Sequence, residues 1–248
     1  MARAIGRDPT GLPACRERAK ERGVRACGDF RMYDPAEARQ RMVENQLKPN
    51  RITDPRLLRA MAEIPRELFV PPTLKNAAYV DEDIPLGDGA FLIEPLALAK
   101  LVQAARIARE NVALVIGDPT GYAGAVVARL AATVILLVSD AEQAAAIDRR
   151  ILEVGAENLL VQVGDPRAGL PEQAPFDVIL LVGAVRSVPQ TLLDQLADGG
   201  RLVAVVSDGR PGEVTVFTRV GDAFGRVVVD DARIPELVAL RPAPAFTF

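Results

Sequence analysis

A glycine turn after an apolar segment is the first place in this chain where residue types and spacing could support chemistry. Residues 112–124 read VALVIGDPTGYAG, so an apolar run stops at Gly117 and an Ala/Val-rich helical pattern follows Gly121. In open α/β sheets, a strand, a glycine turn and a helix present a nucleotide-like cofactor at the carboxyl end of the strand. The two glycines are therefore candidate cofactor contacts, although any doubly wound domain could use them for the strand-to-helix turn alone.

The absence of histidine limits the chemistry that the chain can perform. With no histidine in 248 residues, Ser-His-Asp and Cys-His nucleophiles, histidine general bases and histidine-based zinc sites are excluded. Any reaction must rely on carboxylates, hydroxyls, backbone groups or a bound cofactor. We predict no metal site and assign no catalytic side chain.

The elements that would position this turn follow a strand–helix alternation. Apolar runs without a polar face are typical of parallel strands covered on both sides of the sheet. Their spacing predicts strands at Val112–Ile116, Val134–Val138, Leu159–Val163, Val178–Val182 and Leu202–Val206. Helices are predicted at Leu96–Arg109, Tyr122–Ala131, Glu142–Val154 and Pro189–Ala197. A Gly-containing loop joins Glu213–Arg219 to Arg226–Asp231, which predicts an antiparallel hairpin at the end of the sheet.

Two helices precede this alternation. Asp34-Pro35 and Asp54-Pro55 each place a capping carboxylate before a proline, a common helix start. The first helix is expected to reach about Leu47 and the second about Glu63. Residues 77–91 read as a loop with short extended pieces and a turn at Gly87-Asp88-Gly89. The sequence thus predicts an α/β domain with an N-terminal helical cap over residues 32–248.

Composition places the chain among ordinary globular proteins. Hydrophobic residues make up 49% of it and the net charge is −3, which does not suggest nucleic-acid binding. No stretch reaches 18 consecutive apolar residues, so no membrane span is expected. Both cysteines lie within residues 1–31, and with neither a secretory signal nor a cysteine in the domain the expected location is the cytoplasm. The sequence does not indicate an oligomeric state.

Residues 1–31 differ in composition from the rest. They carry eight Arg/Lys and four Asp/Glu, a net charge of +4 against −7 for the remainder, and they have no periodic apolar face. We expect a disordered extension, or an upstream start codon with Met32 as the true initiator. A basic docking arm is the alternative, and a disulfide or metal clip between Cys15 and Cys27 has less support.

Five stretches of the chain, in order, resemble the protein-L-isoaspartate O-methyltransferase family. The resemblance covers roughly residues 36–219, and its strength comes from the order and near-correct spacing of the blocks rather than from any single one. The blocks are Arg41–Leu47 with Ile52–Asp54, Ala60–Met61 with Ile64–Pro71, Ala78–Asp81 with Ile84–Gly87, Gly164–Asp165 with Gly169–Pro171 and Ala174–Ile179, and Leu193–Val206.

This resemblance implies a Rossmann-like, class I S-adenosylmethionine-dependent methyltransferase. Such an enzyme methylates the carboxylate of isoaspartyl residues in damaged proteins and peptides, which are the partners it implies. The matched positions imply cofactor contacts at Gly117, Gly121, Tyr122 and Asp165. An acceptor carboxylate is already ionised at neutral pH, so a chain without histidine needs no general base.

Several positions in the matched motifs are substituted. The family's acceptor loop resembles Gly-Gln-Thr-Ile-Ser-Gln-Pro, whereas residues 89–95 read GAFLIEP, with Phe91 and Ile93 in place of the two hydroxyls and Glu94 next to them. The cofactor turn has Pro119 where the middle glycine is expected. Val138 occupies the position of the ribose-binding acid.

Two hypotheses therefore remain open from the sequence. The first is a working carboxyl methyltransferase of the isoaspartyl-repair type. The second is a non-catalytic relative that keeps the scaffold as a binding or regulatory module, with lost or weak cofactor binding. Asp140 is the nearest acid that could replace the missing ribose contact, but its position before a helical pattern favours a capping role. Asp165 likewise could cap a turn before Pro166 instead of binding adenine.

Overall fold

A computed structural model describes residues 33–208 and 211–241. The described residues from Pro35 onward belong to one compact unit. The predictions for residues 1–31 lie outside the described residues. No helix in the described part is both long and apolar enough to cross a membrane.

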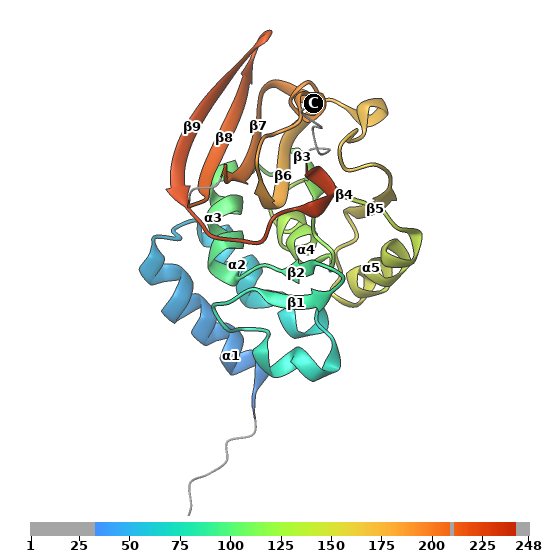
Figure 1. Ribbon diagram of the computed structural model, residues 1–248. Coiled ribbons are helices and arrows are strands. Elements are labelled where there is room, and N and C mark those ends of the chain that lie inside the picture. The colour runs from blue at the N-terminus through green and yellow to red at the C-terminus, as the bar shows by residue number, and fades with distance from the viewer. Residues whose placement is uncertain (1–32, 209–210, 242–248) are drawn as a thin grey trace, which may run out of the picture. The chain divides into compact units, whose positions relative to one another are not determined.

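The central feature is a seven-stranded sheet in the order β5-β4-β3-β6-β7-β8-β9, which Figure 1 shows from right to left. The first five of these strands run parallel, and β8 and β9 are added antiparallel. The bounds are β3 Val112–Ile116, β4 Thr133–Val138, β5 Leu159–Val163, β6 Phe176–Val185, β7 Leu196–Val206, β8 Glu213–Val220 and β9 Ala223–Asp231. The predicted parallel sheet and closing hairpin are confirmed.

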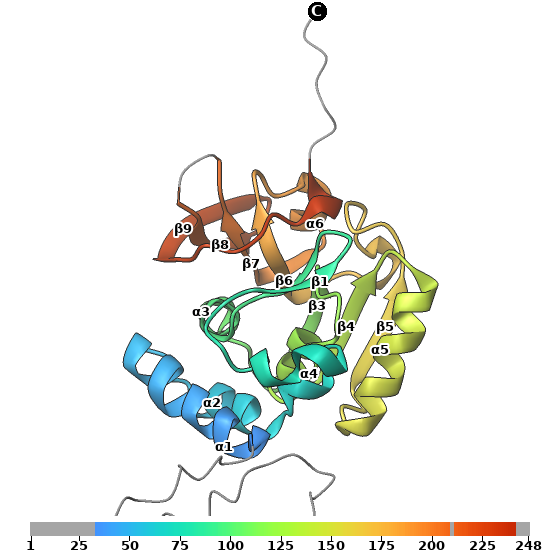
Figure 2. The ribbon, with the colours of Figure 1, turned by 60° about the horizontal axis from the view of Figure 1, so that its bottom comes forward.

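Alternate residues of each central strand pack on opposite faces of the sheet. Ala113 and Val115 join one apolar cluster, whereas Leu114 and Ile116 join the other. This two-residue period explains why a strand buried on both faces has no polar side in the sequence. The helices α3 Pro95–Ala105, α4 Tyr122–Ala128 and α5 Ala141–Glu153 lie along one face (Figure 2).

The predicted N-terminal cap is present as α1 Pro35–Met42, continued by a π turn Val43–Leu47, and α2 Pro55–Glu63. The Asp54 carboxylate accepts a hydrogen bond from the Arg56 N–H, as a helix cap should. Short 3₁₀ turns follow at Arg66–Leu68 and Pro72–Ala77. The two-stranded sheet β1 Ile84–Gly87 and β2 Ala90–Leu92 then leads the chain into α3.

Three predicted helices are shorter in the structure. Helix α3 stops at Ala105 because Arg106 adopts a left-handed conformation, φ 49°, and α4 stops at Ala128. The helix predicted over residues 189–197 is reduced to α6 Gln190–Leu193. There, Leu196 instead pairs with Phe176 and begins β7, so sheet pairing replaces the last helical turns.

Candidate functional site

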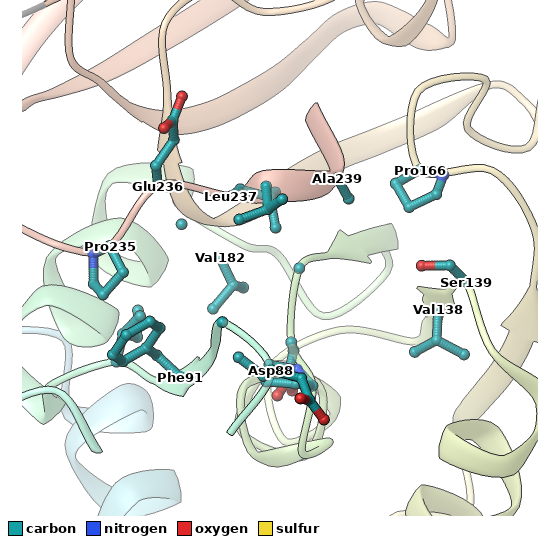
Figure 3. A pocket seen from close by; sticks show the side chains of 18 of the residues that line it. Asp88, Phe91, Val138, Ser139, Pro166, Val182, Pro235, Glu236, Leu237 and Ala239 are labelled. Carbon is teal, nitrogen blue, oxygen red and sulfur yellow. The ribbon is translucent and has the colours of Figure 1, made fainter. Parts of the chain in front are cut away.

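A cavity of about 250 Å³ lies at the carboxyl ends of β3, β4 and β6 (Figure 3). Ligands of open α/β sheets bind in this crevice. Segments far apart in sequence line it: the β1–β2 turn and loop, the turn after β3, the end of β4 with the start of α5, the end of β6, and a C-terminal segment. The lining includes Asp88, Phe91 and Ile93, then Gly117 to Pro119, Val138, Ser139 and Gln143, Val182 and Gly183, and Pro235 to Ala239.

The turn after β3 is stabilised by a buried carboxylate. Asp118 is 2% exposed and accepts hydrogen bonds from the backbone N–H groups of Thr120, Gly121 and Gly124 at 2.9–3.0 Å, and from the Thr120 hydroxyl at 2.9 Å. The Thr120 hydroxyl in turn accepts from the Tyr122 N–H at 3.1 Å. These bonds satisfy donors at the start of α4 that have no partner within the helix. No role was predicted for Asp118 from the sequence, so this role was missed.

Pro119 fits this turn without distorting it. The left-handed residues are Gly117 and Gly121, both with φ 89°, and Pro119 lies between them. The carbonyl of Pro119 accepts a hydrogen bond from the Gln143 Nε2 at 3.2 Å, which links the turn to the first part of α5. The positive-φ positions are thus the two glycines that the chain retains.

At the end of β4 the side chains change from apolar to polar. Val138 is 4% exposed, and Ser139 after it is exposed and lines the cavity. Asp140 caps α5, its Oδ2 accepting from the Gln143 N–H at 2.8 Å, as its sequence context predicted. Asp140 is not among the residues that line the cavity.

The loop that resembles the family's acceptor loop borders the same cavity. Phe91 lines it (Figure 3), and Ile93 is 3% exposed. Arg66, fully buried, holds this loop in place by donating from Nη2 to the Ile93 carbonyl and from Nε to the Ala78 carbonyl, both at 2.6 Å. Burial lowers the pKa of Arg66.

Glu94 lies beside this loop but is not among the cavity's lining residues. Its N–H donates to Asp83 Oδ1 at 2.9 Å. Desolvation, reinforced by the negative charges of Asp81 and Asp83, raises the pKa of Glu94 to about 7. The Glu94 carboxyl group therefore keeps its proton to a higher pH than an ordinary glutamate.

The C-terminal segment closes one side of the cavity. Leu237 N donates to the Ala184 carbonyl at 2.7 Å, and Ala184 N donates to the Pro235 carbonyl at 2.8 Å, so the segment pairs with the end of β6. The Leu237 side chain of this segment packs against Gly117 and Gly183, where a side chain on either residue would clash with it. A Cβ at Gly117 would lie 2.8 Å from the Leu237 methyls, and one at Gly183 would lie 2.9 Å from the Leu237 Cβ.

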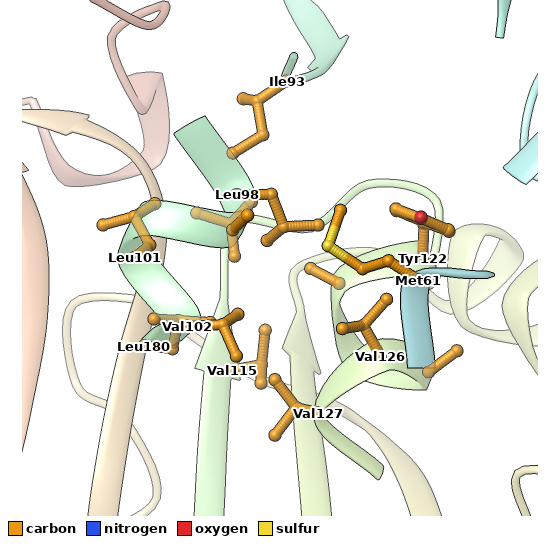
Figure 4. Packing of buried hydrophobic residues seen from close by; sticks show 14 of the residues in the cluster. Met61, Ile93, Leu98, Leu101, Val102, Val115, Tyr122, Val126, Val127 and Leu180 are labelled. Atoms are coloured by element: carbon orange, nitrogen blue, oxygen red, sulfur yellow. The ribbon is translucent and has the colours of Figure 1, made fainter. Parts of the chain in front are cut away.

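The four predicted cofactor contacts occupy different environments. Gly117 lines the cavity, whereas Gly121, Tyr122 and Asp165 are not among its lining residues. The Tyr122 ring packs in the core (Figure 4), 5.4 Å from the Phe69 ring between centroids and 4.8 Å beneath the Arg66 guanidinium. Asp165 is exposed and accepts a hydrogen bond from the Arg167 N–H at 2.9 Å. This bond fits the alternative given in the sequence analysis, in which Asp165 caps a turn.

Comparisons with known proteins identify the relatives of this fold. The family model described as protein-L-isoaspartate(D-aspartate) O-methyltransferase matches residues 37–234. A protein-L-isoaspartate O-methyltransferase of Methanoregula boonei is 37% identical over 206 residues, which cover 83% of this chain and 95% of that protein. Its counterpart in Synechococcus sp. is 39% identical over 207 residues, covering 83% of this chain and 81% of that protein.

Solved structures give the same relationship. A protein-L-isoaspartate O-methyltransferase superposes with a TM-score of 0.69 at 25% identity; the match covers 80% of this chain and 65% of that one. A structure from Plasmodium falciparum, in complex with S-adenosyl-L-homocysteine, also has a TM-score of 0.69 at 17% identity, covering 81% of this chain and 98% of that one. This second likeness shows the fold alone.

Proposed function

The chain belongs to the protein-L-isoaspartate O-methyltransferase family, and on this premise we propose that it transfers a methyl group from S-adenosylmethionine to the carboxylate of isoaspartyl residues in proteins and peptides. One observation carries the proposal. The loop that resembles the family's acceptor loop and the turn that resembles its cofactor turn line the same cavity. A methyl donor and an acceptor carboxylate bound by these two segments would therefore meet.

The residues around the cavity fit a cofactor of this kind. Gly117 borders the cavity, Phe91 and Val182 offer apolar walls, and Ser139 and Gln143 supply polar groups at one end. When bound, S-adenosylmethionine supplies a methyl group on a sulfonium, which is electrophilic without further activation. The protein's task is to align donor and acceptor and to exclude water, which accounts for a large part of catalysis in such reactions.

The predicted cofactor contacts take different roles in this proposal. Gly117 contacts the cofactor directly, since it lines the cavity, and Gly121 and Tyr122 shape the turn and helix behind it. Asp165 stays a prediction for the adenine side. Phe91 and Ile93 bring no side-chain donors, so the acceptor carboxylate must be held by other groups of this loop or its neighbours.

Neither comparison favours the alternative of a non-catalytic relative. The relatives that match most of this chain are named as methyltransferases, which gives no support to the doubt about the cofactor. The doubt about the cofactor came from two substitutions, Pro119 and Val138, and the structure gives a context for each. Pro119 occupies a turn whose left-handed positions are glycines, and Val138 is followed by polar side chains at the cavity.

The direct test is methyl transfer to a synthetic peptide that contains one isoaspartyl residue. The same peptide with a normal aspartyl residue is the matched control. We expect methyl ester formation on the isoaspartyl peptide only, with inhibition by S-adenosylhomocysteine. If neither peptide is methylated and calorimetry detects no binding of S-adenosylhomocysteine, the binding-module alternative replaces this proposal.

A further inference from the structure

The end of β4 lacks the acid that usually holds a cofactor ribose. In α/β cofactor domains a carboxylate about 20 residues after the glycine turn accepts hydrogen bonds from the ribose hydroxyls. The corresponding residue here is Val138, which is apolar and 4% exposed. Asp140, the acid nearest to Val138 along the chain, has one carboxylate oxygen engaged by the Gln143 N–H and does not line the cavity. A local shift of Asp140 would cost α5 its cap.

Gln143 reaches the cavity from the first turn of α5. Its main-chain N–H is fixed by Asp140, and its side-chain Nε2 donates to the Pro119 carbonyl at 3.2 Å. Because this bond uses one of the two amide N–H groups, the other N–H and the carbonyl oxygen remain for a ligand. Gln143 is therefore fixed by one main-chain and one side-chain hydrogen bond, and its side-chain amide lies between the cofactor turn and the end of β4.

Ser139 supplies a second polar group at the same end of the cavity. It directly follows Val138, and Figure 3 shows its hydroxyl directed toward the cavity. A hydroxyl can donate and accept at once, as a ribose hydroxyl can. Ser139 lies four residues before Gln143 in the chain, and both residues line the cavity together with Val138.

We propose that Ser139 and Gln143 together bind the ribose hydroxyls of the cofactor in place of the missing carboxylate. This inference rests on the proposed function and names the residues that allow it without an acid. Both groups are neutral, and a neutral hydrogen bond contributes less to binding than one to a carboxylate. Loss of either side chain should therefore weaken binding by about three- to tenfold, rather than abolish it.

The test is calorimetric binding of S-adenosylhomocysteine to the wild-type protein and to Ser139→Ala and Gln143→Leu. Gln173→Leu is the matched control, since Gln173 is exposed and bonds to Gln162 away from the cavity. Each protein is also titrated with an analogue of S-adenosylhomocysteine that lacks both ribose hydroxyls. Thermal midpoints of all variants check that they are folded.

We expect Ser139→Ala and Gln143→Leu each to weaken binding of S-adenosylhomocysteine by about three- to tenfold, with Gln173→Leu unchanged. The analogue should bind the wild-type protein more weakly, and the two site variants should bind it as the wild type does. If Gln143→Leu weakens both ligands equally, Gln143 acts only by supporting the Pro119 turn and the inference is wrong. Unchanged affinities in both variants would also overturn it, with the proposed function intact. Absence of binding to the wild-type protein would overturn both.

Discussion

Replacing Asp118 by alanine should destabilise this protein far more than loss of an ordinary helix cap. Asp118 is 2% exposed and accepts from three backbone N–H groups and one hydroxyl. Removing a cap costs about 1 kcal/mol, and each buried donor left without a partner costs about 1–3 kcal/mol more. Water entering from the cavity would satisfy some of these donors, so we expect a loss of about 3–5 kcal/mol.

The matched control lies in the same chain. Asp140 caps α5 from an exposed position with a single bond to a backbone N–H, so Asp140→Ala should cost about 1 kcal/mol. Each kcal/mol lowers the midpoint of a domain of this size by about 2–4 °C. Thermal unfolding followed by circular dichroism should thus separate the two variants by roughly 10 °C. Asp118→Asn, which keeps one acceptor oxygen, should fall between them. If Asp118→Ala were no less stable than Asp140→Ala, the buried network would not stabilise the turn.

Three further substitutions test other parts of the site. Gly117→Ala should lower the free energy of unfolding by about 1–2 kcal/mol because of its left-handed backbone, and by more because the new Cβ clashes with Leu237. In a Leu237→Ala background the clash with the Leu237 methyls disappears, so a double-mutant cycle by urea unfolding should show positive coupling. Additive losses of stability would contradict the contact. The contribution of Glu94 to stability should fall as the pH rises from about 4.5 to about 7, because Glu94, whose pKa is raised to about 7, binds a proton longer in the folded than in the unfolded state. Solvent screening limits this change to about 1 kcal/mol. The thermal midpoint of Glu94→Gln should lack that part of the pH dependence. Arg66→Lys has one nitrogen in place of the guanidinium fork. It should raise the KM for an isoaspartyl peptide more than the Kd for S-adenosylhomocysteine, because Arg66 binds the Ile93 carbonyl in the loop that resembles the acceptor loop. Equal effects on both constants would mean that Arg66 acts only through general stability.

The parallel sheet could be predicted from the sequence because its strands are buried on both faces. The run Val112–Ile116 was placed with the bounds that the structure gives, as was Leu159–Val163. Helix ends were less predictable because the usual stop residues are missing. Helix α3 ends at Arg106 in a left-handed conformation that glycine would normally adopt. The early start of β7 depends on pairing of Leu196 with Phe176, a contact that no local pattern reports.

The site could be predicted only where its residues are neighbours in sequence. Gly117 and Gly121 follow from the turn, and the role of Asp118 had a usable indication, an acid just before a helix start. The contact of Gln143 with Pro119 spans 24 residues, and that of Leu237 with Gly117 spans 120. These contacts exist because parallel strands end at one edge of the sheet, and that arrangement becomes visible only in the fold.

The substitutions in the cofactor turn are best understood as a coupled set. Asp118 binds the N–H groups of its own turn, so hydrogen bonds within the chain hold the turn. The Pro119 carbonyl then bonds the Gln143 amide, whose main-chain N–H is in turn bound by Asp140. Asp118 and Pro119, which look like losses when each is compared alone with the family motif, thus both accept hydrogen bonds, Asp118 within the turn and Pro119 from α5. We expect that reverting one position to the family residue, such as Pro119→Gly, will not improve cofactor binding while its partners remain. Glycine adds backbone freedom at a position of the turn that does not need a positive φ, since the positive-φ residues there are Gly117 and Gly121.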